Sequence, residues 1–408
     1  MKIWKSLILN TSLVFGSLVL AIILGELALR IAGIEHQPPL PSDSESLAYT
    51  VKDPYRGWSP RPNIQTVWAG EGEVSEVKMN SFGMRDRERT LERPTNSYRI
   101  AVLGDSFIEA LQVPLEKTAL AVMETQLKTC PILKGKTVEV LNFGVQGYGT
   151  AQQLMTWRHH AQQFSPDLVI LGFYPGNDIR NNHRALEHDH LRPYFVEENG
   201  QLVEDLSFRT LNPNGLERDQ YTFSKLDQLP YSLITNSRIL QLIRQAEIES
   251  KRRQLQKDYQ ETDINFYKEP TDQNWQQAWN ITEQLITLLQ DEVKAKGKDF
   301  MVIMVTDSFQ VLPDPEKRQE FMEKHQIQDL LYPNKRIEAL GKKQGFPVLQ
   351  LAEPLRKEAE KTGICLHGFE NAEVCGGHWN VEGNRTAGEL MASQVCQQLM
   401  GQTPKFPK

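Results

Sequence analysis

The stretch "RIAVLGDSFIEALQVP", Arg99 to Pro114, begins as a buried strand and ends in a polar turn. Its opening run is short, continuous and apolar, which is typical of a strand covered on both faces of a parallel sheet. Gly104–Ser106 closes the strand, and a helical pattern follows. A serine at this place either caps the helix or is a nucleophile held at the edge of the sheet. The rest of the sequence bears on that choice.

Strand and helix patterns alternate through the following chain. Apolar runs predict strands over Tyr98–Leu103, Val138–Phe143, Leu168–Phe173, Phe300–Val305 and Pro347–Leu351. Helical periodicity lies between them, at Glu116–Lys128, Thr150–Gln163, Asn274–Lys296 and Tyr332–Gln344. Strands that alternate with helices predict right-handed crossovers and a parallel sheet covered on both faces. We therefore expect a three-layer α/β domain over residues 98–400.

The N-terminal segment is apolar. Residues 6–25, "SLILNTSLVFGSLVLAIILG", carry no charge, and ~20 helical residues span the ~30 Å hydrocarbon core of a bilayer. Two lysines precede the segment, which places the N-terminus in the cytoplasm. A cleaved signal peptide is the alternative, but no small-x-small site ends the segment. We expect residues 1–30 to form a single-pass anchor in the cytoplasmic membrane, residues 31–48 a linker, and the remainder to lie on the extracytoplasmic, periplasmic side.

One further segment precedes the expected domain, and another interrupts it. Residues 49–97 show short extended runs broken by Gly, Pro and Asn, which predict edge strands and loops packed on the main domain. Residues 180–272 are too long for a plain loop and indicate an inserted subdomain. The insertion contains a hairpin signal with Asn199-Gly200 at its turn, followed by a long helical pattern.

Composition excludes some function classes. The chain of 408 residues has a formal charge of −6 and no strongly basic tract, so no nucleic-acid partner is expected. Its four cysteines lack the C-x-x-C spacing of a zinc site. We expect neither a metal nor a cofactor.

Chemistry-bearing side chains follow the expected strands. The first strand ends in "GDSF" (104–107), the second in "NFGVQGYGT" (142–150) and the third in "GFYPGNDIRNN" (172–182), while "GGHWNVEGN" (376–384) precedes the last helix. The carboxyl ends of parallel strands meet at one edge of the sheet. A hydroxyl, a glycine and an amide therefore converge there, and a histidine could act as the base that a serine nucleophile needs.

These four blocks, in this order, resemble the SGNH/GDSL hydrolases. The stretch "NSFGMRD" (80–86), preceded by an anchor, resembles membrane-anchored bacterial members of that family. The resemblance implies a flavodoxin-like domain in which Ser106 is the nucleophile and His378 the general base. It also implies an oxyanion hole formed by the backbone N–H groups of Ser106 and Gly147 and by the side chain of Asn177.

One position departs from the family pattern. The family usually has an aspartate three residues before the histidine, where this chain has Cys375. Asp307 and Glu373 are candidates for the missing third member. The preferred interpretation is a Ser–His dyad in which a backbone carbonyl holds His378.

The cysteines lie on the side of the membrane where disulfides persist. A Cys365–Cys375 bond would close a small loop beside His378 and fix it in place of the aspartate. Cys130 follows the first helix and Cys396 lies in the last, so these two could form a second bond if the helices share a face. Free thiols or another pairing are the alternatives.

Together these features predict serine-dependent hydrolysis or transfer of an ester-linked acyl group outside the membrane. The substrate is an acyl ester, an O-acetyl or other short acyl group, with a cell-envelope saccharide or lipid as its carrier. The sequence leaves open whether water or a sugar hydroxyl accepts the acyl group. The alternative is a catalytically degenerate module that binds or scaffolds exported polysaccharide, and Cys375 is its main support.

Overall fold

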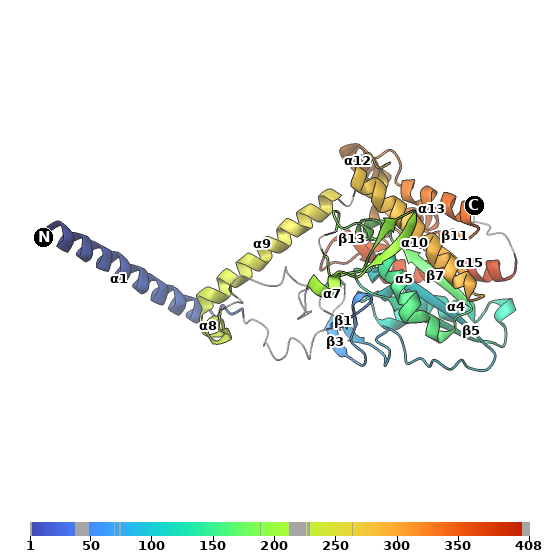
Figure 1. Ribbon diagram of the computed structural model, residues 1–408, viewed down its shortest axis with the longest axis horizontal. Helices are drawn as coiled ribbons and strands as arrows, with labels where there is room; N and C mark the ends of the chain where they lie inside the picture. The colour runs from blue at the N-terminus through green and yellow to red at the C-terminus, as the bar shows by residue number, and fades with distance from the viewer. Residues whose placement is uncertain are drawn as a thin grey trace. The chain divides into compact units, whose positions relative to one another are not determined.

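The structure is a computed structural model of the chain (Figure 1). It describes residues 2–36, 49–68, 70–72, 75–187, 189–211, 226, 229–262 and 264–401. The chain separates into two compact units, one formed by residues 1–48 and 216–261 and the other by residues 49–215 and 262–408. Most of the expected linker, from residue 37 to residue 48, lies outside the described residues.

The second unit is built on a five-stranded parallel sheet. Its strands are β5 (Ser97–Gly104), β6 (Thr137–Gly144), β7 (Leu168–Phe173), β10 (Asp299–Met304) and β11 (Val348–Gln350). Their spatial order is β6-β5-β7-β10-β11. Numbered along the chain this order is 2-1-3-4-5, the flavodoxin-like order. The predicted three-layer α/β architecture and its five strands are confirmed.

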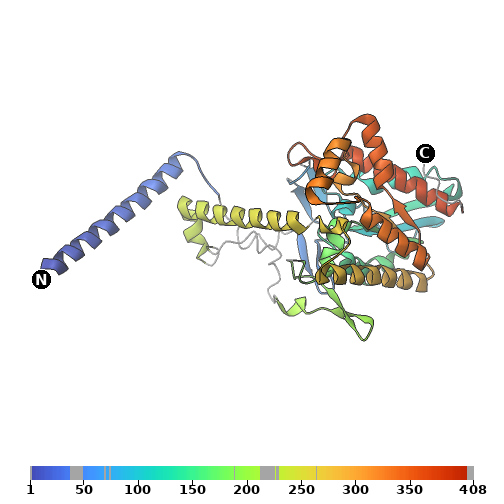
Figure 2. The same ribbon diagram turned by 90° about the horizontal axis from the view of Figure 1, so that it is seen from above.

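Helices cover both faces of this sheet. One face carries α5 (Thr150–His159), α10 (Gln273–Ala295) and α13 (Tyr332–Gln344), and the other carries α4 (Ala119–Leu127), α14 (Ala352–Thr362) and α15 (Val381–Leu399). In Figure 2 the gold α10 and the red α15 lie on opposite sides of the strands. Alternate residues of β5 enter the two cores: Ala101 and Leu103 one, Ile100 and Val102 the other. Because both faces of each strand are buried, successive residues are apolar and the strands form continuous apolar runs in the sequence.

Short elements surround the sheet. The connecting helices are α3 (Ser106–Glu109), α6 (Pro175–Asp178), α11 (Ser308–Val311) and α12 (Pro315–His325), and 3₁₀ turns span Leu115–Lys117, Pro131–Leu133, Ala161–Phe164, Arg180–Asn182 and Asn265–Tyr267. A small antiparallel pair, β12 (His367–Gly368) and β13 (Val374–Trp379), precedes α15.

The segment before the sheet forms two hairpins. They are β1 (Thr50–Asp53) with β2 (Gly57–Pro60), and β3 (Gln65–Trp68) with β4 (Ser75–Lys78). The expectation of edge strands is wrong, because these strands pair with each other and not with the central sheet. Neighbouring short strands can pair through a brief hairpin connection, whereas joining the parallel sheet as a further parallel strand needs a long crossover.

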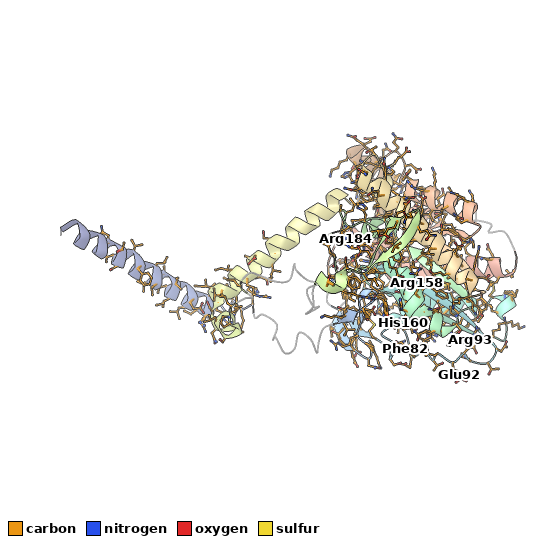
Figure 3. All side chains as sticks on the ribbon, viewed as in Figure 1. Phe82, Glu92, Arg93, Arg158, His160 and Arg184 are labelled. Carbon is orange, nitrogen blue, oxygen red and sulfur yellow. A yellow bond between two sulfur atoms is a disulfide. The ribbon has the colours of Figure 1, made fainter. Side chains whose placement is uncertain are left out.

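The first part of the insertion belongs to this unit. The predicted hairpin is confirmed as β8 (Tyr194–Glu198) and β9 (Gln201–Asp205), with Asn199 and Gly200 at positive φ in the turn. The short helix α7 (Phe208–Leu211) follows. Arg158 of α5, labelled in Figure 3, pairs with Glu204 of β9 and Glu292 of α10, and so ties the hairpin to the helical layer.

The first unit contains α1 (Lys2–Ile31), α8 (Tyr231–Asn236) and α9 (Arg238–Thr262). Among the described residues α1 alone is long and apolar enough to cross a membrane, with a mean hydropathy of 2.3 over Asn10–Ile31. Near the end of this stretch the Glu26 carboxylate accepts hydrogen bonds from the backbone N–H of Arg238 at 3.0 Å and from the Ser237 hydroxyl at 3.2 Å. The carboxylate therefore caps the start of α9.

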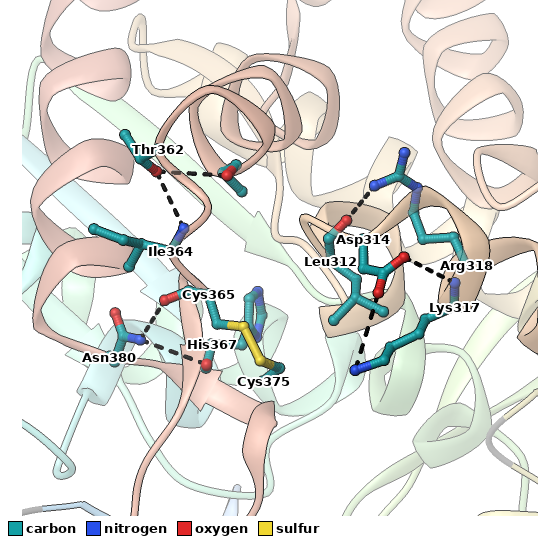
Figure 4. The surroundings of a disulfide bond; sticks show 11 residues. Leu312, Asp314, Lys317, Arg318, Thr362, Ile364, Cys365, His367, Cys375 and Asn380 are labelled. Carbon is teal, nitrogen blue, oxygen red and sulfur yellow. Dashed lines mark hydrogen bonds and ion pairs between the residues drawn. A yellow bond between two sulfur atoms is a disulfide. The ribbon is translucent and has the colours of Figure 1, made fainter.

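The structure contains both disulfides that the sequence suggested. Cys130–Cys396 joins the turn that follows α4 to α15 with a Cα–Cα distance of 5.7 Å, and Cys365–Cys375 closes a loop with a Cα–Cα distance of 5.1 Å. Figure 4 shows the second bond beside Asn380, whose side-chain amide donates to the Cys365 carbonyl at 2.7 Å. The loop is thus fixed to the start of α15.

Candidate active site

Ser106 lies where β5 turns abruptly into α3. The Asp105 side chain caps α3 by accepting a hydrogen bond from the Phe107 N–H at 2.9 Å. The helix ends after one turn at Ala110, which has a left-handed conformation. A Cβ on Gly104 would lie 2.3 Å from the Ile108 side chain, so glycine permits the tight strand-to-helix turn. The turn leaves the Ser106 side chain partly exposed at the carboxyl edge of the sheet.

His378, on β13, faces this serine. Its Nε2 atom lies 2.7 Å from Ser106 Oγ, a hydrogen-bond distance. The Phe107 ring packs against the imidazole with centroids 4.7 Å apart and limits its movement. The two residues are 272 positions apart in the sequence. The structure therefore brings together the hydroxyl and the imidazole that the sequence placed in one site.

The far side of the imidazole carries a carboxylate that the sequence analysis missed. Glu71 accepts a hydrogen bond from the His378 ring through Nδ1 and another from the His378 backbone N–H at 2.8 Å. Burial alone would raise the pKa of Glu71, but the hydrogen bonds and the charge of His378 outweigh it and lower that pKa. The expected Ser–His dyad is therefore wrong, because a third, ionised member is present.

The two residues suggested as third member lie elsewhere. Asp307 caps α11 by accepting from the Phe309 N–H at 3.0 Å, and it also accepts from the hydroxyls of Tyr174 and Tyr267. Glu373 is exposed in the disulfide-closed loop. The structure thus places Glu71, and neither Asp307 nor Glu373, against the ring.

A buried chain of hydrogen bonds supports the strand that carries His378. His367 donates from Nδ1 to the Gly377 carbonyl at 2.7 Å and accepts at Nε2 from the Thr306 hydroxyl at 3.0 Å. The same hydroxyl accepts from the Trp379 indole N–H at 2.8 Å. Burial lowers the pKa of His367 to about 4, so this ring is neutral at pH 7 and keeps the tautomer that the chain requires. The backbone on both sides of His378 is therefore fixed.

Gly147 and Asn177 follow the neighbouring strands. Gly147 has a φ of 76°, a conformation that side-chain-bearing residues rarely adopt. Its carbonyl accepts from the Asn181 side chain at 3.2 Å, and among the described residues nothing accepts from its backbone N–H. Asn177 lies in α6, and its buried Oδ1 has no partner in the described part of the chain. Strand register brings both loops to the edge that bears Ser106, because Gly104 pairs with Gly144 and Leu103 with Leu171.

Two buried carboxyl groups lie behind this edge. Burial raises the pKa of Asp105 to about 6, although hydrogen bonds from the Phe107 N–H and the Asn177 side chain act in the opposite direction. Burial and the charge of Asp105 raise the pKa of Asp178 well above its usual value. Asp178 also accepts from the Tyr174 N–H at 2.9 Å and the Gln153 amide at 3.0 Å. Both carboxyl groups are therefore held by hydrogen bonds just behind the loops that follow β5 and β7.

Comparisons with known sequences return no match, either to family profiles or to curated proteins. Comparison with solved structures finds an acetyl xylan esterase with 11% identity and a TM-score of 0.38, covering 73% of this chain and 99% of that one. A lipase/acylhydrolase from Enterococcus faecalis has 11% identity and a TM-score of 0.35, covering 76% and 100%. A GDSL-like lipase from Bacteroides thetaiotaomicron VPI-5482 has 13% identity and a TM-score of 0.34, covering 75% and 91%.

Similarities at this level carry no argument about what this chain does. Three features of this chain itself bear on its function instead: the order of strands in the sheet, the four sequence blocks and the contacts around Ser106. The flavodoxin-like order puts the ends of β5, β6 and β7 side by side, and His378 reaches Ser106 from the segment before the last helix. The five-stranded parallel sheet with helices on both faces fits the α/β fold of the SGNH/GDSL hydrolases.

Proposed function

We propose that this protein is a serine esterase or acyltransferase that acts on short acyl esters through Ser106, His378 and Glu71. The observation that carries the proposal is the continuous line of hydrogen bonds from the Ser106 hydroxyl through both ring nitrogens of His378 to the Glu71 carboxylate. A serine hydroxyl becomes an effective nucleophile when an oriented imidazole accepts its proton.

The reaction follows from these positions. Ser106 Oγ attacks the acyl carbonyl while His378 Nε2 takes the hydroxyl proton, and Glu71 stabilises the imidazolium. The backbone N–H groups of Ser106 and Gly147 and the Asn177 amide donate to the oxyanion. In other acyl-transfer enzymes each such donor stabilises the transition state by about 3–4 kcal/mol. His378 then gives the proton to the leaving alcohol, and water or a sugar hydroxyl attacks the acyl-enzyme in the same way.

We assign a short acyl group, such as an O-acetyl ester on a cell-envelope saccharide, as the substrate class. Ser106 and His378 are both partly exposed, with 23% of the His378 side chain accessible. An ester on a large polymer needs an accessible serine of this kind, because most of its carrier stays outside the protein. The Trp379 ring is buried against the core and is not available to stack on a sugar.

We further propose that α1 anchors the protein in the cytoplasmic membrane and that residues 49–401 lie on the extracytoplasmic side. The contacts of Glu26 with Ser237 and Arg238 support a retained helix, because cleavage would remove the cap of α9. The two disulfides support an oxidising compartment. Alkaline carbonate extraction and protease protection of spheroplasts test the location. Release of the protein by carbonate would contradict the anchor.

The test of the chemistry uses the full chain in detergent. Ser106→Ala should abolish turnover of p-nitrophenyl acetate and labelling by a fluorophosphonate probe, while the melting temperature stays that of the wild type. Ser308→Ala is the matched control, since this serine lies at the start of another short helix and should keep both activities. A Ser106→Ala protein with wild-type turnover would refute the nucleophile. Saccharide binding without labelling of the wild type would favour the non-catalytic alternative.

A further inference from the structure

Glu71 reaches the site from outside the central sheet. It lies in the turn between β3 and β4, and those two strands pair only with each other. Trp68 steadies the turn from within by donating its indole N–H to the Glu71 carbonyl at 2.6 Å. That bond fixes the turn to its own hairpin and not to the segment that holds His378. A second contact must therefore hold the turn against the ring.

Asn371 provides that contact. Its side-chain amide donates to the Gly70 carbonyl at 2.9 Å and to the Gly72 carbonyl at 2.7 Å, and its Oδ1 accepts from the Gly72 N–H at 3.0 Å. These three hydrogen bonds join it to the residues immediately before and after Glu71. Asparagine suits the place because it combines two N–H donors with one acceptor, whereas aspartate has no donor.

The loop that carries Asn371 is closed by a disulfide. Cys365 and Cys375 bracket the loop, and within it the Ala372 N–H donates to the Phe369 carbonyl at 3.1 Å. Closing a loop of this size removes much of the freedom that its residues would otherwise have. Asn371 is therefore presented by a loop fixed at both ends next to the strand of the catalytic histidine.

The turn also approaches the main domain closely. Gly72 has a φ of 101°, and a Cβ at this position would lie 2.4 Å from the Gln112 carbonyl oxygen. Position 72 therefore requires a glycine, because side-chain-bearing residues rarely adopt this φ and because a Cβ would clash with the Gln112 carbonyl. The turn is thus held between the backbone at Gln112 and the side chain of Asn371.

We propose that Asn371 is a positioning residue that keeps Glu71 on His378, and that the Cys365–Cys375 bond acts in the same way by fixing Asn371. This inference rests on the proposed function for its kinetic readout. Asn371 touches neither Ser106 nor the reacting atoms, so its effect passes entirely through Glu71. Loss of the contact misplaces the carboxylate, and a misplacement of about 1 Å lowers rates by up to about a hundredfold.

The kinetic test compares Asn371→Ala and Asn371→Asp with Glu370→Gln, a change in the exposed neighbouring side chain. Both Asn371 variants should lower kcat for p-nitrophenyl acetate by about tenfold to a hundredfold, with KM and the melting temperature unchanged. In a Glu71→Gln background Asn371→Ala should have no further effect, because residues that act through one another are not additive. An equal loss in both backgrounds, or none in either, overturns the proposal.

Removing each of the two disulfides in turn gives a matched comparison. Cys365→Ser with Cys375→Ser should lower kcat as Asn371→Ala does. Cys130→Ser with Cys396→Ser should lower the free energy of unfolding and leave kcat unchanged, because that bond joins helices away from the site. Identical effects of the two pairs on kcat would contradict the role of the loop.

A spectroscopic readout separates this inference from the esterase proposal. The proton between His378 Nδ1 and Glu71 should give a far-downfield proton resonance that a His378→Gln variant lacks. Asn371→Ala should weaken or remove it, and Glu370→Gln should keep it. If the wild type does not hydrolyse esters but Asn371→Ala removes the resonance, the proposed function fails and the positioning role stands. If Asn371→Ala keeps both the resonance and the wild-type kcat, the positioning role is refuted.

Discussion

Replacing Glu71 by glutamine keeps the size of the side chain and one hydrogen-bonding oxygen but removes the charge. In the wild type this carboxylate accepts from both the ring and the backbone of His378. The ring bond becomes a bond between opposite charges once the imidazole has taken the proton of Ser106. The neutral amide loses that stabilisation, and if its NH₂ group turns toward the ring it also selects the wrong tautomer.

The size of the effect follows from the surroundings of the pair. A hydrogen bond to a charged group contributes about 1.5–3 kcal/mol, and two unit charges about 4 Å apart near a protein surface attract by about 4 kcal/mol. The Glu71 side chain is 19% exposed, so solvent screens part of this attraction. We expect a loss of about 3–4 kcal/mol in the transition state, which is a decrease of about 10²–10³ in kcat.

The assay is turnover of p-nitrophenyl acetate by the full chain as a function of pH. Glu71→Gln should lower kcat and leave KM unchanged, because the amide cannot stabilise the imidazolium charge that forms in the transition state. Glu76→Gln is the control, since this glutamate lies on the same hairpin and bonds to Gln65. Glu373→Gln should behave like the control. A Glu71→Gln enzyme with the kcat of the control, together with a loss in Glu373→Gln, would refute the assignment.

Three further predictions test the site and the scaffold. Because burial raises the pKa of Asp105 from 3.8 to about 6, the folded state binds more protons in that range, so the free energy of unfolding should fall as the pH rises through it. Asp105→Asn, which keeps an acceptor for the Phe107 N–H, should flatten this dependence in denaturant titrations, and an unchanged slope would contradict the shift. Cys130→Ser with Cys396→Ser should lower the free energy of unfolding by about 2–5 kcal/mol, measured the same way, and an unchanged midpoint would contradict the bond. Gly147→Ala keeps the backbone N–H but strains the backbone at a φ of 76°, so it should displace this oxyanion donor and reduce kcat by up to about 10²-fold; a wild-type kcat would remove Gly147 from the site.

The sequence was sufficient for the parts of the fold that depend on local patterns. Apolar runs identified all five strands of the sheet because each strand is buried on both faces, and Asn199-Gly200 identified the β8–β9 hairpin because its turn needs two residues at positive φ. Ser106 and His378 were predictable for a related reason. Each lies in a block at the end of a strand or the start of a helix, where a parallel sheet brings distant segments to one edge.

Glu71 was not predictable in this way. It is 307 positions from His378 and lies in a hairpin that pairs with no strand of the central sheet, so no periodic pattern connects the two. Asp307 follows a strand and Glu373 lies close to the histidine in the sequence, but neither relation brings a carboxylate to the ring. One signal was present: Gly70 and Gly72 frame Glu71, and a glycine at position 72 allows the turn to lie against the backbone at Gln112.

Cys375 and Glu71 can be understood as two parts of one arrangement. An imidazolium needs a carboxylate at its far nitrogen, and the position of that carboxylate in the sequence does not matter. An aspartate three residues before His378 would supply the charge from the same strand. Here that place is taken by a cysteine whose disulfide closes the loop of Asn371, and Asn371 in turn binds the turn that brings in Glu71. The departure that argued for a degenerate site is therefore part of what holds the replacement carboxylate in place.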